Sequence, residues 1–284
     1  MKFIDFYYIL EGGKALSGTS KIEQKDIPDT LKDLEFLVLK KLGNLKKGET
    51  WDLGGSALKK SSPSGDLDII IDQNAIDTKG QPVLDYLYDV VNRLGLQSVL
   101  MRGLGIVSVA FPIHGTDRKV QIDLMPTDNF EFTKWSYHSP YEKETRFKTN
   151  MGTYRTELLK AIAAEIEKEV IDKFPTEEPK TVKRLALSSD KGLSRKIISY
   201  AGKKNNILKN PIDIEKTLIS KDPNEIIKIL LGPNTTKEDT QSFETIYKKM
   251  MSPDFPYKDK IPQIKKNYIN RLKEKNLEIP GEFL

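Results

Sequence analysis

A chain of 284 residues, 38% hydrophobic and 31% charged, has enough apolar side chains for the buried core of one large domain or two ordinary ones. It contains no apolar run near the ~18 residues that a membrane span needs, and its N-terminus lacks the small-residue cleavage site of a signal peptide. With no cysteine and only two histidines, it cannot form disulfides, thiolate zinc sites or a histidine-rich metal site. These features predict a cytoplasmic protein in which oxygen atoms would hold any metal ion.

The basic charge is concentrated in the second half of the chain. Residues 1–150 hold 20 Lys and Arg against 21 Asp and Glu, whereas residues 151–284 hold 26 against 20, so the halves carry net charges of −1 and +6. Eight basic residues with one acid among them lie between 180 and 204: Lys180, Lys183, Arg184, Lys191, Arg195, Lys196, Lys203 and Lys204. Such a stretch is either a solvated surface or a binding site for RNA or another nucleic acid.

Residues 1–150 predict one compact domain of helices and strands. Helices are expected over 28–42 and within 81–95, each with a proline near its start and a glycine at its end. Strands are expected within 50–56, 67–72, 97–101, 105–113 and 119–125, where short apolar runs end at glycines and aspartates. The pattern indicates a mixed sheet flanked by helices.

Residues 151–284 predict a second, mainly α-helical domain. In "TYRTELLKAIAAEIEKEVI", Tyr154, Leu158, Ile162, Ile166 and Val170 lie on one stripe of a helix. Further helices are expected over 212–220, 223–231, 236–252 and 260–275. The fold class is therefore α+β.

Two aspartates lie at the start of the apolar run "GDLDIII". In a strand, Asp66 and Asp68 point to the same face, while Leu67 and its alternate neighbours point to the core. Two close carboxylates repel each other unless a cation lies between them. Asp123 is an acid in the otherwise buried strand "KVQIDLM" and supplies a third oxygen ligand. The three acids predict a site for Mg²⁺ or Mn²⁺.

A glycine-rich turn precedes the acids. Gly55 lets the backbone approach a ligand closely, and a short helix expected over 56–60 would aim its N-terminus at that ligand. The Ser56 hydroxyl adds a hydrogen-bonding group, and Lys59 and Lys60 add positive charge. Amides, a hydroxyl and lysines beside a metal site indicate a binding site for a nucleoside triphosphate.

These motifs resemble the signature of the DNA polymerase β superfamily of nucleotidyltransferases. Gly55 and Ser56, nine intervening residues, the run Asp66–Ile69 and a distal Asp123 follow the superfamily's order and spacing. The resemblance covers residues 28–126. The wording "LGGSALKKSSPSGDLDIII" is also similar to nucleotidyltransferase-like proteins of large tailed phages, which would place the protein in the host cytoplasm. No helix-hairpin-helix motif for gripping DNA is recognisable in the sequence.

The resemblance implies a role for each of these residues. Gly55 and Ser56 would hold the β- and γ-phosphates of an NTP. Asp66 and Asp68 would each ligate two divalent ions, and Asp123 would ligate the catalytic ion and help to remove a proton from the acceptor hydroxyl. The hydroxyl would then attack the α-phosphate, and pyrophosphate would leave.

Three functions follow as alternatives. The first is a template-independent nucleotidyltransferase that modifies an RNA end, a protein or a small molecule. The second is a catalytically inactive protein of the same fold that binds nucleotides or nucleic acid. The third is a templated repair polymerase, which the missing DNA-grip motif disfavours.

Overall fold

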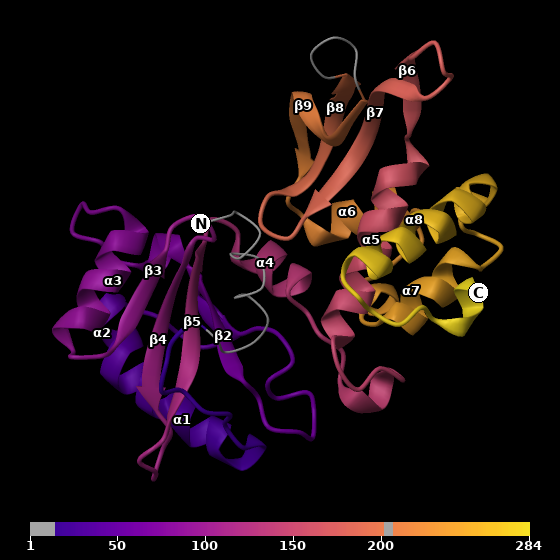
Figure 1. Ribbon diagram of the computed structural model, residues 1–284. Coiled ribbons are helices and arrows are strands. Elements are labelled where there is room, and N and C mark those ends of the chain that lie inside the picture. The colour runs from indigo at the N-terminus through magenta and orange to yellow at the C-terminus, as the bar shows by residue number, and fades with distance from the viewer. Residues whose placement is uncertain (1–14, 202–206) are drawn as a thin grey trace. The chain divides into compact units, whose positions relative to one another are not determined.

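The computed structural model describes residues 15–201 and 207–284, and the chain divides into two compact units (Figure 1). The first unit ends at Lys143 and the second begins at Glu144. Each unit combines helices with its own sheet, so the predicted α+β class is confirmed.

The first unit is built on a five-stranded mixed sheet with the strand order β1-β2-β5-β4-β3. Its strands are β1 (Trp51–Leu53), β2 (Asp66–Asp72), β3 (Ser98–Met101), β4 (Ile106–Pro112) and β5 (Lys119–Thr127). β2 and β5 run parallel, and the other neighbouring strands pair antiparallel. All five predicted strands are therefore present.

Helices cover one face of this sheet. They are α1 (Ile27–Leu34), a π-helical turn (Glu35–Leu39) and α2 (Lys40–Leu42), which continue one another, and α3 (Val83–Arg93). Their apolar side chains form one buried cluster with Leu67, Ile69 and Ile71 of β2 and with Ile122 and Leu124 of β5. Both helices predicted for this half are confirmed. A further helix, α4 (Phe130–Ser136), follows β5.

The second unit contains a four-stranded antiparallel sheet that the sequence analysis did not predict. Its strands, in the order β6-β7-β8-β9, are β6 (Glu169–Lys173), β7 (Pro179–Ser188), β8 (Gly192–Ala201) and β9 (Ile207–Ser220). The mainly α-helical prediction is thus wrong in extent, and the helix predicted over 212–220 is wrong. That segment alternates apolar and polar residues, as in "IDIEKTL", which is the period of a strand.

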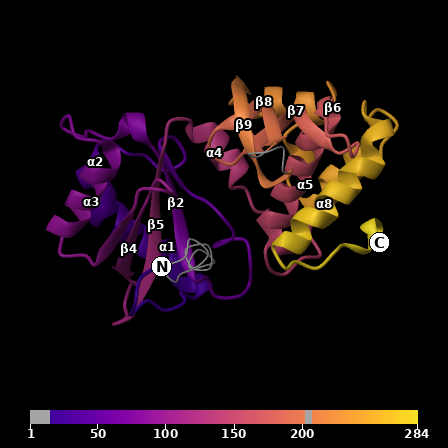
Figure 2. The ribbon, with the colours of Figure 1, turned by 45° about the horizontal axis from the view of Figure 1, so that its top comes forward.

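Four helices complete the second unit: α5 (Met151–Ile166), α6 (Pro223–Leu231), α7 (Phe243–Met250) and α8 (Ile261–Glu274). The predicted stripe on α5 is confirmed up to Ile166, but Val170 lies on β6, where it pairs with Val182 of β7, and it is 41% exposed. Figure 2 shows α8 lying along α5, and their contact buries Tyr268. In the described part of the chain, no helix is both long and apolar enough to cross a membrane.

α5 is the centre of the second unit, and its buried charges are paired. Arg155 is 1% exposed and donates a hydrogen bond from Nε to the carbonyl of Thr240. Glu157 accepts from Arg271 at 3.1 Å, and Glu165 accepts from an asparagine of α8 at 2.7 Å. Buried charges are tolerated only with such partners, so these contacts help to hold α5 in the core of the second unit.

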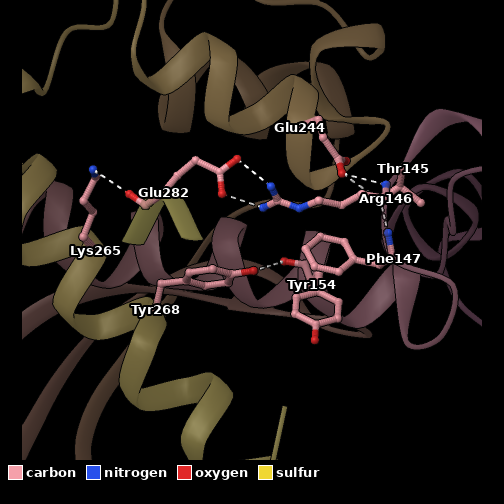
Figure 3. A network of polar contacts seen from close by, with 8 residues as sticks. All are labelled: Thr145, Arg146, Phe147, Tyr154, Glu244, Lys265, Tyr268 and Glu282. Atoms are coloured by element: carbon pink, nitrogen blue, oxygen red, sulfur yellow. Dashed lines mark hydrogen bonds and ion pairs between the residues drawn. The ribbon is translucent and has the colours of Figure 1, made fainter. Parts of the chain in front are cut away.

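The end of the chain is anchored to the start of the second unit (Figure 3). Arg146 makes two parallel hydrogen bonds with Glu282, at 2.7 and 2.6 Å, and its own amide donates to Glu244. Tyr154 stacks on Phe147 with ring centroids 3.7 Å apart, and its carbonyl accepts from the hydroxyl of a buried tyrosine of α8. These contacts hold residues 145–147 and Tyr154 against α7, α8 and the last residues of the chain.

Phe283→Ala should lower the free energy of unfolding of the second unit by about 3–5 kcal/mol. Phe283 is 7% exposed and packs against the rings of Phe243, Tyr247 and Tyr268 at 4.9–5.8 Å. The neighbouring Leu284 is 90% exposed. Leu284→Ala should therefore stay within about 0.5 kcal/mol of the wild type in urea unfolding followed by circular dichroism. Equal effects of the two substitutions would contradict the anchoring of the chain end.

Candidate active site

Three carboxylates lie on one face of the five-stranded sheet. In the parallel pairing of β2 with β5, Asp68 lies opposite Asp123, and Asp66 lies opposite Gln121. Alternate residues of a strand share a face, and so do paired residues of neighbouring strands. The acids therefore occupy the face opposite the helix-covered core, and β2 and β5 bring together the residues that the sequence analysis singled out.

The Asp68 carboxyl resists ionisation. Burial, together with the smaller effect of the neighbouring charges of Asp66 and Asp123, raises its pKa to about 7. Burial also raises the pKa of Asp123, although hydrogen bonds from Ser108 and Gln121 oppose that effect. A site of this kind favours either a proton or a cation between the carboxylates.

Asp123 is held by two polar side chains that the sequence analysis did not single out. It is 8% exposed, and Ser108 on β4, which lies opposite it, donates from Oγ to Oδ1 at 2.5 Å. Gln121 donates from Nε2 to Oδ1 and Oδ2 at 3.0 and 3.2 Å. In sequence, a single polar residue inside an apolar strand, as in "IVSVAF", is the signal that points to Ser108.

The glycine turn approaches Asp68 closely. The N–H of Gly54 donates to the Asp68 carbonyl at 2.8 Å, and the N–H of Gly55 donates to the carbonyl of Tyr137 at 3.2 Å. Gly55 has a φ of +64°, and a Cβ on it would lie 2.6 Å from Asp68 Oδ2. Glycine is therefore required here for two reasons, backbone conformation and space. Both glycine amides are already bonded, so they are not the donors that the sequence analysis expected for phosphate.

The short helix predicted over 56–60 is wrong. Residues 56–59 form a turn in which the N–H of Lys59 donates to the Ser56 carbonyl at 3.0 Å. The Lys59 carbonyl accepts from the N–H of Glu142 at 2.8 Å, which diverts the backbone from helical hydrogen bonding. Among the described residues, the amides of Ser56, Ala57 and Leu58 have no acceptor, so these three are the backbone donors of the turn that a phosphate would meet.

A cavity of about 300 Å³ lies beside the turn on the same side of the sheet as the acids. It includes Ile70, which follows Asp68 by two residues and so shares its face. Its lining consists of Lys47, Asp52, Leu53, Gly54, Gly55, Leu58, Lys59, Ile70, Lys134, Tyr137, His138 and Tyr141. The cavity thus contains two of the predicted nucleotide-binding residues, Gly55 and Lys59, but neither Ser56 nor Lys60.

Three lysines give the cavity a positive charge. Lys59 Nζ lies 3.3 Å from Nδ1 of His138 and 5.8 Å from the ring centroid of Tyr141. Lys134 forms an ion pair with Asp52 at 3.3 Å, and Lys47 lies over the ring of a buried tryptophan. With three lysines and one aspartate on its walls, the cavity favours an anionic ligand, and its aromatic rings offer flat contacts to a base.

A divalent cation fits the donor chemistry of the acidic face but not its arrangement as it stands. Oxygen ligands, mutual repulsion and the close approach of Gly55 to Asp68 all suit Mg²⁺ or Mn²⁺. Over residues 15–201 and 207–284, however, no group of three or more His, Cys, Asp or Glu side chains is arranged to hold a metal ion. The register already brings the three acids to one place, so cation binding would require rotation of side chains and no movement of strands.

The basic stretch predicted as a nucleic-acid site lies on β7, β8 and the turn between them. Four of its residues form ion pairs with acids of neighbouring segments: Lys180 with Asp172, Lys183 with Glu169, Arg195 with Glu167, and Lys196 with Asp213. Lys203 and Lys204 lie outside the described residues. The local positive charge is therefore smaller than the sequence from 180 to 204 indicates.

Comparisons with protein-family models and with curated protein sequences found no match to this chain.

Asp68→Asn should remove a pH dependence of stability. The pKa of Asp68 is about 7 in the folded chain, against an ordinary 3.8. Between these values the folded chain keeps a proton that the unfolded chain has lost, so the free energy of unfolding falls as the pH rises. We expect the variant to match the wild type near pH 4 and to exceed its stability by roughly 1–4 kcal/mol near pH 8. Urea titrations in EDTA measure this difference.

The matched control is Asp117→Asn, at an exposed carboxyl of the same unit. It should leave the wild-type slope unchanged. A wild-type slope in Asp68→Asn would mean that Asp68 ionises freely in the folded chain.

Proposed function

We propose that the chain is a template-independent nucleotidyltransferase, which transfers a nucleoside monophosphate from an NTP to an acceptor hydroxyl. The observation that carries this proposal is the register of β2 with β5, because it brings Asp66, Asp68 and Asp123 to one face beside the Gly54–Gly55 turn. The resemblance of these motifs to the DNA polymerase β superfamily supports it.

The two sides of the glycine turn provide two halves of a nucleotide site. On one side are the carboxylates, which would hold Mg²⁺ or Mn²⁺; the ions would supply charge neutralisation and acidify the acceptor hydroxyl. On the other side, Lys47, Lys59 and Lys134 line a cavity that favours phosphate groups. Triphosphate oxygens would accept from the Ser56 hydroxyl and from turn amides, while Asp123 would be a ligand of the catalytic ion. The protein's contribution is then mainly positioning and electrostatics.

A catalytically inactive nucleotide-binding protein is the second candidate. Two observations favour it: no group of acids in the described part of the chain is arranged to hold a metal ion, and Asp123 is already hydrogen bonded to Ser108 and Gln121. Such a protein would bind NTP through the lysine-lined cavity without consuming it.

Activity and binding assays separate the two candidates. The purified chain is incubated with each labelled NTP, Mg²⁺ or Mn²⁺ and total RNA, and both label transfer and pyrophosphate release are measured. A transferase should release pyrophosphate, and Asp66→Ala, Asp68→Ala and Asp123→Ala should each abolish the release while the exposed Asp117→Ala retains it. Retained activity in any of the three site variants contradicts the proposed mechanism. Tight NTP binding without turnover would favour the inactive protein.

Neutralising the basic strands tests whether the acceptor is a nucleic acid. If RNA is the acceptor and binds to residues 180–204, changing Lys183, Arg184, Arg195 and Lys196 together to glutamine should weaken RNA binding at least about tenfold and flatten its salt dependence. NTP binding should be unaffected, because these residues lie outside the unit that holds the turn. Fluorescence anisotropy at several salt concentrations measures both. Unchanged RNA affinity would favour a protein or small-molecule acceptor.

A further inference from the structure

Gln121 is a buried polar residue in the middle of β5 that no motif of the sequence explains. Its side chain is enclosed, with only 3% of the residue exposed. A buried amide is stable only when both its ends are hydrogen bonded. The nitrogen of Gln121 donates to both oxygens of Asp123, and its oxygen accepts from the N–H of Ala15 at 3.0 Å.

The N–H of Ala15 determines which way the Gln121 amide points. A backbone N–H can only donate, so Oε1 must face Ala15 and Nε2 must face Asp123. In the reversed orientation, Oε1 would face a carboxylate and the NH₂ group would face another donor. A backbone group 106 residues earlier in the chain therefore fixes the donor that Asp123 receives.

The hydrogen bonds leave Asp123 with one partly unused oxygen. Oδ1 accepts from Ser108 Oγ and from Gln121 Nε2, and these two bonds use both of its lone pairs. Oδ2 accepts only from Gln121 among the side chains of residues 15–201 and 207–284, so it retains one lone pair. The carboxylate is thus fixed in orientation and has a single position for one more partner.

Gln121 also has a defined place among the acids. It is the register partner of Asp66, as Asp123 is of Asp68, and all four residues share one face of the sheet. We infer that Gln121 is a positioning residue, which holds Asp123 so that Oδ2 alone binds a divalent cation. This inference rests on the proposed function, because it assigns a role within the same metal site.

The test is Mn²⁺ binding by the full chain, measured by electron paramagnetic resonance. Gln121→Met keeps the length of the side chain but removes all three hydrogen bonds of the amide, and it should weaken Mn²⁺ binding by about 10–100-fold, as is typical when a group that holds a metal ligand is lost. Gln97→Met makes the same change at an exposed glutamine of the same unit and should leave the affinity unchanged. Asp68→Asn should abolish binding and thereby identify the site.

A turnover measurement separates positioning from general loosening of the site. If Gln121 positions Asp123, Gln121→Met should lower kcat while the KM for NTP stays within about twofold, because the lysine-lined cavity is unchanged. A rise in KM together with lost Mn²⁺ affinity would indicate a merely structural role and overturn the inference.

The remaining outcomes are equally decisive. Mn²⁺ affinity in Gln121→Met equal to or above that of the wild type overturns the inference, since the glutamine would then be neutral or a competitor of the ion. If that variant fails to fold, Ala15→Pro, which removes the backbone donor and leaves Gln121 in place, should also weaken Mn²⁺ binding, and unchanged affinity there overturns it. A wild-type chain that binds no Mn²⁺ rejects the proposed function itself, and the inference with it.

Discussion

The parallel pairing of β2 with β5 is the constraint on which the candidate site depends. It places Asp68 opposite Asp123 on one face, and on the other it places Leu67 and Ile69 opposite Ile122 and Leu124 in the core. A slip of one residue would turn the apolar side chains away from the helices and the carboxylates into them. The hydrophobic burial that stabilises the first unit therefore also sets the relative positions of the acids. No further interaction is needed to align them.

Burying a charged side chain costs free energy unless the side chain is hydrogen bonded. The two units differ in how their buried charges are bonded. In the second unit, the buried Arg155 and Glu157 are hydrogen bonded to Thr240 and Arg271. In the first unit, Asp123 accepts hydrogen bonds from Ser108 and Gln121. Asp68 has acids as its charged neighbours, and burial together with these charges raises its pKa to about 7. A buried carboxyl with a strongly raised pKa is typical of functional sites, because a buried carboxyl with a purely structural role is normally hydrogen bonded to a donor.

Sequence patterns predicted the first unit well and the second unit poorly, for physical reasons. In the first unit, the alternation around Asp66 and Asp68 and the glycines at helix ends are local signals that the tertiary structure preserves. In residues 180–220, Lys183 and Lys196 indicate a basic surface in the sequence, but their ion pairs with Glu169 and Asp213 come from strand pairing that no local pattern reveals. The role of Gln121 could not be predicted from local sequence, because the orientation of its amide depends on Ala15, 106 residues earlier in the chain.

The difference between a transferase and an inactive binding protein comes down to the freedom of one carboxylate. The register brings the acids together and the glycine turn gives access to them, so neither feature distinguishes the two functions. Asp123 can contribute an oxygen without breaking a hydrogen bond, since Oδ2 retains a lone pair while Oδ1 is saturated. Asp66 and Asp68, which repel each other, would move toward a cation with a gain in free energy. The hydrogen bonds to Asp123 are therefore compatible with a site that a cation completes, and the proposed transferase does not require them to break.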